Sequence, residues 1–234
     1  MNIIIIGSAR TKSTALLEKI CLENPTLKNW GEPLEELIIK SGNFIIKNKD
    51  EYFENRLKKL FLNFDKPNNI IKILGNNFFA KTNYIPYLNL HKFDKIYLVE
   101  RHNFFEQVCS FSVAREEKLF HLNRANEFRY DKMRQNTYTL KKFLTNQMAS
   151  SIGHYLDMKK FVIENKLPYI QYTYEMLDEI KGINHTPVNL DYSKIISNYN
   201  LKGTMNDIFY KNYNYNTCEY NYYAFCKEMD NLLF

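Results

Sequence analysis

The sequence predicts an α/β protein with a mostly parallel central sheet, because strand patterns and helix patterns alternate along the chain. Residues 3–6 are four consecutive isoleucines, which is typical of a strand that is buried on both faces. Sheets of this class bind ligands at the carboxyl ends of their strands. The predicted strands cover residues 2–6, 69–74, 95–99 and 169–172.

Helical spacing of apolar residues marks the segments between these strands. A long helical pattern runs from about residue 130 to 165, and we expect it to break near Ser150–Ser151 or Gly153. The alternation fades beyond about residue 181, where the Asn- and Tyr-rich stretch 211–223 is expected to be an irregular loop or lid. The predicted helices cover residues 13–23, 33–46, 51–64, 103–119, 130–165, 191–200 and 220–233.

The composition fits one folded domain, residues 1–234, whose C-terminal region from about 181 to 234 is irregular or forms a lid. The hydrophobic fraction is 45% and the charged fraction 25%, which excludes a disordered or membrane-embedded chain. No apolar run approaches the roughly 20 residues of a membrane-spanning helix. We therefore expect no transmembrane segment and a cytoplasmic location. The four cysteines and five histidines show no metal-ligand spacing, so we expect reduced thiols and no metal site.

A formal net charge of +6 suits an anionic ligand or partner. The chain is also rich in Ile, Lys, Asn, Tyr and Phe, which all have A/T-rich codons, so a biased genome accounts for the same composition. The 18 Tyr and 17 Phe residues therefore do not indicate base stacking, and no specific nucleic-acid partner is expected.

The segment Gly7-Ser8-Ala9-Arg10-Thr11-Lys12-Ser13-Thr14 connects the isoleucine strand to the first helix. Backbone N–H groups and the helix dipole at such a junction attract anions. The nucleotide-binding P-loop has a second glycine and one more residue before its lysine. No Asp ends a later predicted strand where it would help to hold magnesium. Both departures count against a kinase or NTPase that uses ATP and magnesium, but such an enzyme is kept as an alternative. A turn that binds no ligand is another alternative.

These residues resemble the 5′-phosphosulfate loop of PAPS-dependent sulfotransferases, most closely the bacterial glycolipid and carbohydrate enzymes. Arg10, Thr11, Ser13 and Thr14 fall on its basic and hydroxyl positions, and Lys12 falls where the family usually has glycine.

Residues 95–111 resemble the 3′-phosphate site of the same family, with a strand that ends in Arg101 and a helix that carries Ser110. His102 is the alternative anchor for that phosphate. An arginine fork binds phosphate oxygens in pairs, and a serine hydroxyl adds a donor.

The segment Trp30-Gly31-Glu32-Pro33-Leu34-Glu35-Glu36 resembles the part of carbohydrate sulfotransferases that borders the acceptor pocket and includes the general base. Glu32 is the first candidate for the base, and Glu35 or Glu36 is the second. Acidic residues beside a proline also suit an ordinary helix start, so the same residues have a purely structural interpretation.

The resemblance implies a three-layer α/β sandwich with the P-loop-like sulfotransferase fold and sulfuryl transfer from PAPS, which leaves PAP. Glu32 would deprotonate a hydroxyl of the acceptor, which would be a small molecule, a glycan or a glycolipid. Arg10, Lys12 and Ser13 would neutralise the leaving oxygen, and Arg101 and Ser110 would hold the 3′-phosphate, without a metal. The alternatives are the ATP-dependent enzyme and a non-catalytic module that binds nucleotides or polyanions.

Overall fold

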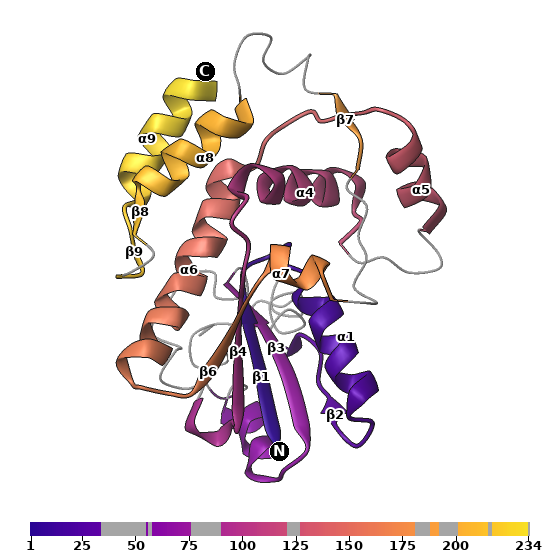
Figure 1. The fold of residues 1–234 in the computed structure, drawn as a ribbon, viewed down its shortest axis with the longest axis vertical. Coiled ribbons are helices and arrows are strands. Elements are labelled where there is room, and N and C mark those ends of the chain that lie inside the picture. Colours follow the sequence, from indigo (N-terminus) through magenta and orange to yellow (C-terminus); the bar gives the residue numbers. More distant parts are fainter. Residues whose placement is uncertain are drawn as a thin grey trace.

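A five-stranded, all-parallel sheet flanked by helices forms the centre of the computed structural model (Figure 1). The structure describes residues 1–33, 55, 58–75, 90–120, 127–180, 188–191, 201–214 and 217–233. The strand order is β2-β3-β1-β4-β6. The strands are β1 (Asn2–Gly7), β2 (Lys28–Asn29), β3 (Asn69–Leu74), β4 (Lys95–Glu100) and β6 (Tyr169–Thr173). The four predicted strands are therefore confirmed. In this sheet the two-residue edge strand β2 was missed, and so were the two-residue strands that pair outside the sheet.

The isoleucine strand β1 is the central strand, and this position explains its composition. It pairs with β3 on one side and β4 on the other, so that Ile4 is opposite both Ile71 and Ile96. Ile3 and Ile5 pack in one apolar cluster with helix α1, while Ile4 and Ile6 join a larger cluster on the opposite face. Both faces of β1 are thus covered, as its continuous apolar sequence requires.

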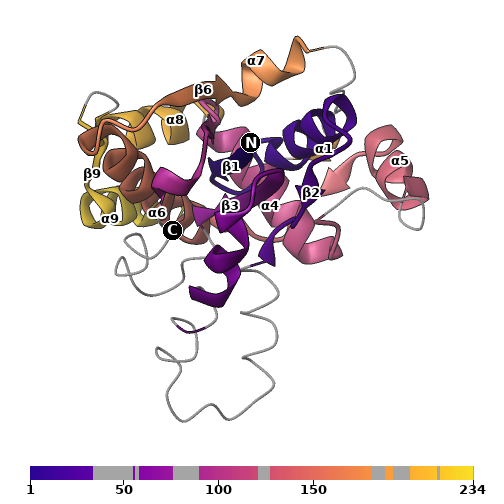
Figure 2. The same ribbon diagram turned by 90° about the horizontal axis from the view of Figure 1, so that it is seen from below.

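Helix α1 (Ser13–Glu23) and the short α7 (Tyr174–Asp178) cover one face of the sheet, and α4 (Phe104–Glu117) and α6 (Thr145–Glu164) cover the other. Viewed along the strands, α1 and α6 lie on opposite sides of β1 (Figure 2). The chain leaves β1 towards one face and leaves the neighbouring strand β4 towards the other. Such a switch point opens a crevice at the carboxyl ends of the two strands.

The helix predictions succeed where the local pattern is strong. The helices expected at 13–23 and 103–119 are confirmed as α1 and α4. Within 51–64, residues 58–62 are helical and continue into the 3-10 turn η1 (Asn63–Asp65). The helix expected at 33–46 lies outside the described residues, apart from Pro33. A second 3-10 turn, η4 (Leu90–Lys92), precedes β4.

The expected break near residues 150–153 is wrong, because α6 runs through Gly153 without interruption. The break lies between α5 (Glu127–Gln135) and α6, where β5 (Tyr138–Thr139) pairs with β7 (Leu190–Asp191). The N–H groups of Lys141 and Lys142 donate to the Glu116 carboxylate, both at 3.0 Å. A side chain of α4 therefore takes the backbone donors that a continuous helix would have bonded internally.

The C-terminal region is more regular than its sequence indicated. Helices α8 (Leu201–Lys211) and α9 (Tyr222–Leu233) lie side by side next to α6 (Figure 1). They are joined through the antiparallel pair β8 (Tyr213–Asn214) and β9 (Glu219–Tyr220), which falls in the predicted loop or lid. The helix predicted at 220–233 is confirmed, α8 was missed, and most of 191–200 lies outside the described residues.

Aromatic rings hold this C-terminal unit against α4. The rings of Phe104 and Phe209 stack at 4.4 Å between centroids, and Phe225 meets Phe104 edge-on at 5.4 Å.

The four cysteines are all free thiols. In the described part of the chain, no helix combines the length and the apolar character that crossing a membrane requires.

Substitution of two glycines, Gly75 and Gly153, tests the packing between the end of β3 and α6. A Cβ atom on Gly75 would lie 2.0 Å from the Ser151 carbonyl oxygen, whereas a Cβ on Gly153 would meet only the Tyr220 ring at 3.8 Å. We expect Gly75→Ala to lower the free energy of unfolding by about 1–3 kcal/mol through overpacking. Gly153→Ala should raise it by roughly 0.5–1 kcal/mol, because alanine is the better helix former. Urea denaturation of both variants measures these changes, and equal effects at the two sites would contradict the described contact.

Candidate anion-binding site

The loop between β1 and α1, residues 8–12, turns tightly against β4. A Cβ atom on Gly7 would lie 3.0 Å from the Val99 carbonyl oxygen and 3.1 Å from Thr11 Oγ1, so any side chain here would push against β4 and the loop. The fully buried Thr11 hydroxyl donates to the Ser8 carbonyl at 2.9 Å. Thr11, predicted to bind the cofactor, thus closes the turn with its side chain. Ser13, the first residue of α1, is also buried.

Two residues of this loop have left-handed backbone conformations. Arg10 has φ 64° and Lys12 has φ 62°, whereas Thr11 between them does not have a positive φ. Such alternation turns successive N–H groups towards one side and forms an anion-binding concavity. Lys12 is also the N-cap of α1 and makes no side-chain cap hydrogen bond, so the first N–H groups of the helix are not taken by it. The position where the resembled family has glycine is thus one that requires a positive φ.

Arg10 joins the two segments that the sequence singled out separately. Its Nε donates to Ser110 Oγ at 2.9 Å, and its Nη1 donates to the Phe120 carbonyl at 2.8 Å. Both partners are neutral, and no described carboxylate is paired with this guanidinium. Burial lowers the pKa of Arg10 below its ordinary value, and the charge of Arg101 adds to the effect. Arg10 is therefore a cation whose charge is not balanced by an acid of the described chain.

Lys12 lies against α7. Its Nζ contacts the Asp178 carboxylate and lies 4.2 Å from the centre of the Tyr174 ring, and the side chain is 7% exposed. Burial, followed by the charge of Arg101, lowers the pKa of Lys12, and the negative charge of Glu175 on the same helix offsets part of this effect. A buried ammonium with a second cation nearby is typical of a site that takes anions.

Arg101 follows β4 and stacks on the same ring, with Cζ 3.8 Å from the centre of Tyr174. Its Nη2 donates to Glu106 Oε2 at 2.8 Å, and its buried Nε has no partner among the described residues. The ring of His102, the alternative anchor, is half exposed and lies 3.6 Å from Glu100 instead. Arg101 is thus the residue of this pair that meets the first loop.

Glu106 is shared between Arg101 and Lys202 of α8, whose Nζ donates to Glu106 Oε1 at 2.9 Å. Burial by itself would raise the pKa of Glu106, but the hydrogen bond from Lys202 and the two positive charges outweigh it and lower the pKa. Glu106 therefore stays ionised between two cations.

A fourth cation, Lys72, lies beside the start of α1. Lys72, in the middle of β3, has only 2% of its side chain exposed, and its Nζ contacts Glu32 Oε1 and Thr14 Oγ1. The candidate base and a predicted cofactor residue are therefore joined beside the start of α1. Sequence reasoning missed Lys72, although a lysine inside an otherwise apolar strand was a visible signal. The second-choice bases Glu35 and Glu36 lie outside the described residues.

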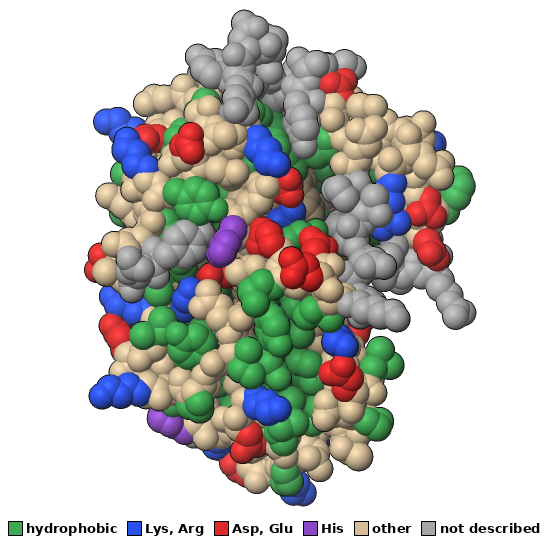
Figure 3. Space-filling view, viewed as in Figure 1, with side chains coloured by type: hydrophobic (Ala, Val, Ile, Leu, Met, Phe, Trp, Pro, Cys, Tyr) green, Lys and Arg blue, Asp and Glu red, His purple; other side chains and the backbone are tan. Residues whose placement is uncertain are grey.

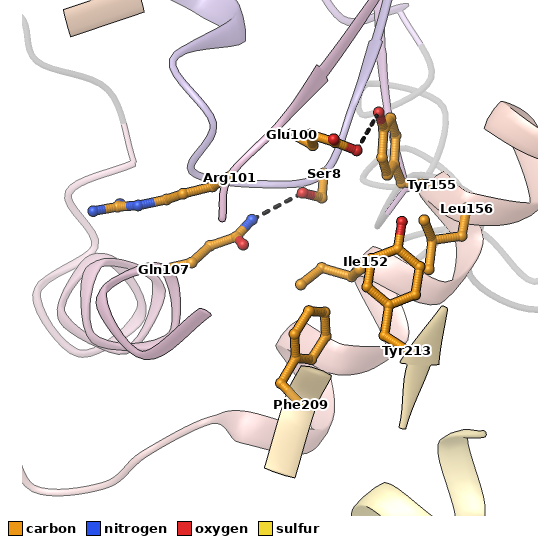
Figure 4. A pocket seen from close by; sticks show the side chains of 9 residues that line it. All are labelled: Ser8, Glu100, Arg101, Gln107, Ile152, Tyr155, Leu156, Phe209 and Tyr213. Atoms are coloured by element: carbon orange, nitrogen blue, oxygen red, sulfur yellow. Dashed lines mark hydrogen bonds between the residues drawn. The ribbon is translucent and has the colours of Figure 1, made fainter. Parts of the chain in front are cut away.

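Behind the loop, side chains of α4 and α6 fix its position. Gln107 donates to Ser8 Oγ at 2.8 Å and to the Ala9 carbonyl at 2.6 Å. Its buried Oε1 has no partner in the described part of the chain, and it borders a cavity of about 10 Å³ that suits one water molecule (Figure 4). Gln107 was not among the predicted site residues, because a single sequence does not show its contact with Ser8 and Ala9, which lie far from it in the chain.

Glu100, at the end of β4, is engaged away from the loop. Its carboxylate accepts hydrogen bonds from Tyr155 at 3.2 Å, Lys159 at 3.0 Å and Gln171 at 2.6 Å. Figure 4 shows the Tyr155 hydroxyl directed at this carboxylate, while the Arg101 side chain extends in another direction. Glu100, the last residue of β4, thus supports α6, whereas Arg101, the next residue, shares the Tyr174 ring with Lys12 of the first loop.

Comparison of the chain with protein-family models, with curated proteins and with solved structures finds no match. The chemistry of the site has to be inferred from the four cations, their partners and the loop that carries two of them.

The backbone of Lys12 provides a test of the loop conformation. Lys12→Gly and Lys12→Ala both remove the ammonium, but only glycine adopts a positive φ without steric cost. We expect the glycine variant to be more stable than the alanine variant by about 1 kcal/mol. Thermal or urea unfolding measures the difference, and an alanine variant of equal stability would show that the residue is not left-handed.

The buried pair of Lys72 and Glu32 provides a second test. Glu32→Gln leaves the ammonium of Lys72 without its carboxylate, and we expect this to lower the free energy of unfolding by about 3 kcal/mol or more. The double variant Lys72→Met/Glu32→Gln should recover most of that loss, because no unpaired charge is then buried. Urea denaturation measures the free energy of unfolding of both variants. Equal values for the double variant and Glu32→Gln would show that the two side chains are not coupled.

Proposed function

We propose that this protein is a PAPS-dependent sulfotransferase with the three-layer, P-loop-like fold, acting on a hydroxyl of a glycan or glycolipid. The observation that carries the proposal is the meeting of two independently predicted phosphate sites. Arg10, expected at the 5′ end of the ligand, donates to Ser110, expected at the 3′ end, at 2.9 Å. A nucleotide with anionic groups at both ends needs cations from both segments at one edge of the sheet.

The charges of the site suit a leaving phosphate. In the proposed reaction, the acceptor oxygen forms a new bond to sulfur while the bond between sulfur and the 5′-phosphate oxygen breaks. The electron pair goes to that phosphate oxygen, and PAP is released. Arg10, Lys12 and the N–H groups at the start of α1 stabilise the developing negative charge. Burial makes these cations more effective than they would be in water.

Glu32 takes the proton of the acceptor hydroxyl in this scheme. The carboxylate contacts Lys72, whose ammonium also reaches Thr14 in the first turn of α1. Lys72 thus holds the base beside the helix start where the transferred group would lie. A base must be within hydrogen-bond reach of the proton that it removes, so this placement is the feature of Glu32 that matters most.

Arg101 would distinguish PAPS from ATP through the 3′-phosphate. Its Nε is buried without a described partner, and a phosphate oxygen would satisfy it. Wild-type protein should therefore bind 3′,5′-ADP, which is PAP, more tightly than 5′-AMP or ATP with magnesium. Incubation with PAPS carrying labelled sulfate and a panel of glycans then tests for transfer.

Arg101→Ala should weaken binding of 3′,5′-ADP roughly 10- to 100-fold, because one or two charge-assisted hydrogen bonds are lost. Binding of 5′-AMP should change little, so the preference for the 3′-phosphate disappears. Arg115→Ala removes the same charge as a control, from an exposed position of α4, the helix that follows Arg101 in the chain. Calorimetric titration of each variant gives the affinities. Stabilisation of the wild type by ATP with magnesium but not by 3′,5′-ADP would rule out the sulfotransferase assignment.

A further inference from the structure

Helix α7 places acidic side chains beside the loop of residues 8–12. Asp178 contacts Lys12, and Glu175 accepts hydrogen bonds from the N–H groups of His102 and Asn103 at 3.4 and 3.3 Å. In the space-filling view, acidic side chains gather over this segment (Figure 3). The exposed acidic residues of α7 and its end are Glu175, Asp178 and Glu179.

The two members of the Lys12–Asp178 pair differ in exposure. The Lys12 side chain is 7% exposed, whereas that of Asp178 is 45% exposed. A buried ammonium needs a counter-charge, since leaving it unpaired costs several kcal/mol. A half-exposed carboxylate loses little when it leaves the pair, because water solvates it. Asp178 is therefore the partner that another anion can replace.

We propose that Asp178 is a specificity-determining residue of this site: it neutralises Lys12 in the ligand-free protein and yields only to an anion that binds Lys12 more strongly than a carboxylate does. The inference rests on the proposed function, since it takes the loop of residues 8–12 as the anion site. Phosphate and sulfate esters meet the condition, because they present several acceptor oxygens to the ammonium and to the N–H groups of the loop. A ligand carboxylate would only replace the Asp178 carboxylate at Lys12, so its binding would bring no net gain in free energy.

Helix α7 stays in place without the Asp178 contact, because other interactions hold it. Thr173 caps the helix and accepts from the Met176 N–H at 3.1 Å, and Leu177 is fully buried against the sheet. The ring of Tyr174 keeps its contact with Arg101 at 3.8 Å. Replacement of Asp178 should therefore change the charge at Lys12 and leave the fold intact.

Calorimetric titration with 3′,5′-ADP tests the proposal on wild type, Asp178→Asn and Glu179→Gln. The last variant removes the same charge from the neighbouring exposed residue as a matched control. We expect Asp178→Asn to bind roughly fivefold more tightly than wild type, and Glu179→Gln to change by less than about twofold. Asp178→Glu should keep the wild-type affinity, and Lys12→Gln should abolish the gain from Asp178→Asn.

The outcomes separate this inference from the proposed function. If Asp178→Asn binds 3′,5′-ADP no more tightly than Glu179→Gln, Asp178 does not compete with the ligand and the inference is wrong. If wild type and Glu179→Gln do not bind 3′,5′-ADP at all, the proposed function is wrong. In that case both variants are titrated with inorganic sulfate. The inference requires Asp178→Asn to bind sulfate more tightly than Glu179→Gln does, and equal or weaker binding overturns it. If Asp178→Asn melts at a much lower temperature, Asp178→Ser is titrated under the same criterion.

Discussion

The close approach of β1 and β4 at their carboxyl ends is the constraint on which the site depends. Gly7 is paired with Val99, and a single added Cβ would already press on the Val99 carbonyl at 3.0 Å. Because the two strands end side by side, the residues that follow them meet at one edge of the sheet. Arg10 and Arg101 are far apart in the chain, yet this pairing brings their charges close enough for each to matter to the other.

Gathering Arg10, Lys12 and Arg101 at one edge of the sheet has an electrostatic cost, and the structure offsets it in different ways. Lys12 has a carboxylate and an aromatic ring, and Arg101 has Glu106 and the same ring. Arg10 has only neutral hydrogen-bond partners among the described residues. Arg10 is thus the cation of these three whose charge no described carboxylate balances, and the charge of Arg101 acts on it. Uncompensated charge of this kind is typical of sites that favour binding over stability.

The sequence predicted the parts of the fold that local signals control. Four isoleucines identify β1, and the helical periodicity after Ser13 identifies α1 within one or two residues. The break before α6 was misplaced because it depends on Glu116, a side chain of another helix. Likewise, the partners of Lys72 lie 40 or more residues away in the chain, and a single sequence carries no record of such contacts. The loop itself was recognisable, but the acids that neutralise it were not.

Arg10 and Lys12 hold a backbone shape that glycine would adopt more easily. A glycine-rich loop samples many conformations until a ligand selects one, and the lost freedom weakens binding. Here the loop is built from arginine, threonine and lysine, and it is fastened from behind by Gln107 and by Ser151, which accepts from the Ala9 N–H at 3.4 Å. Part of the conformational entropy of this loop is therefore lost already when the protein folds. An anion that fits the folded loop would lose less entropy on binding than it would with a glycine-rich loop.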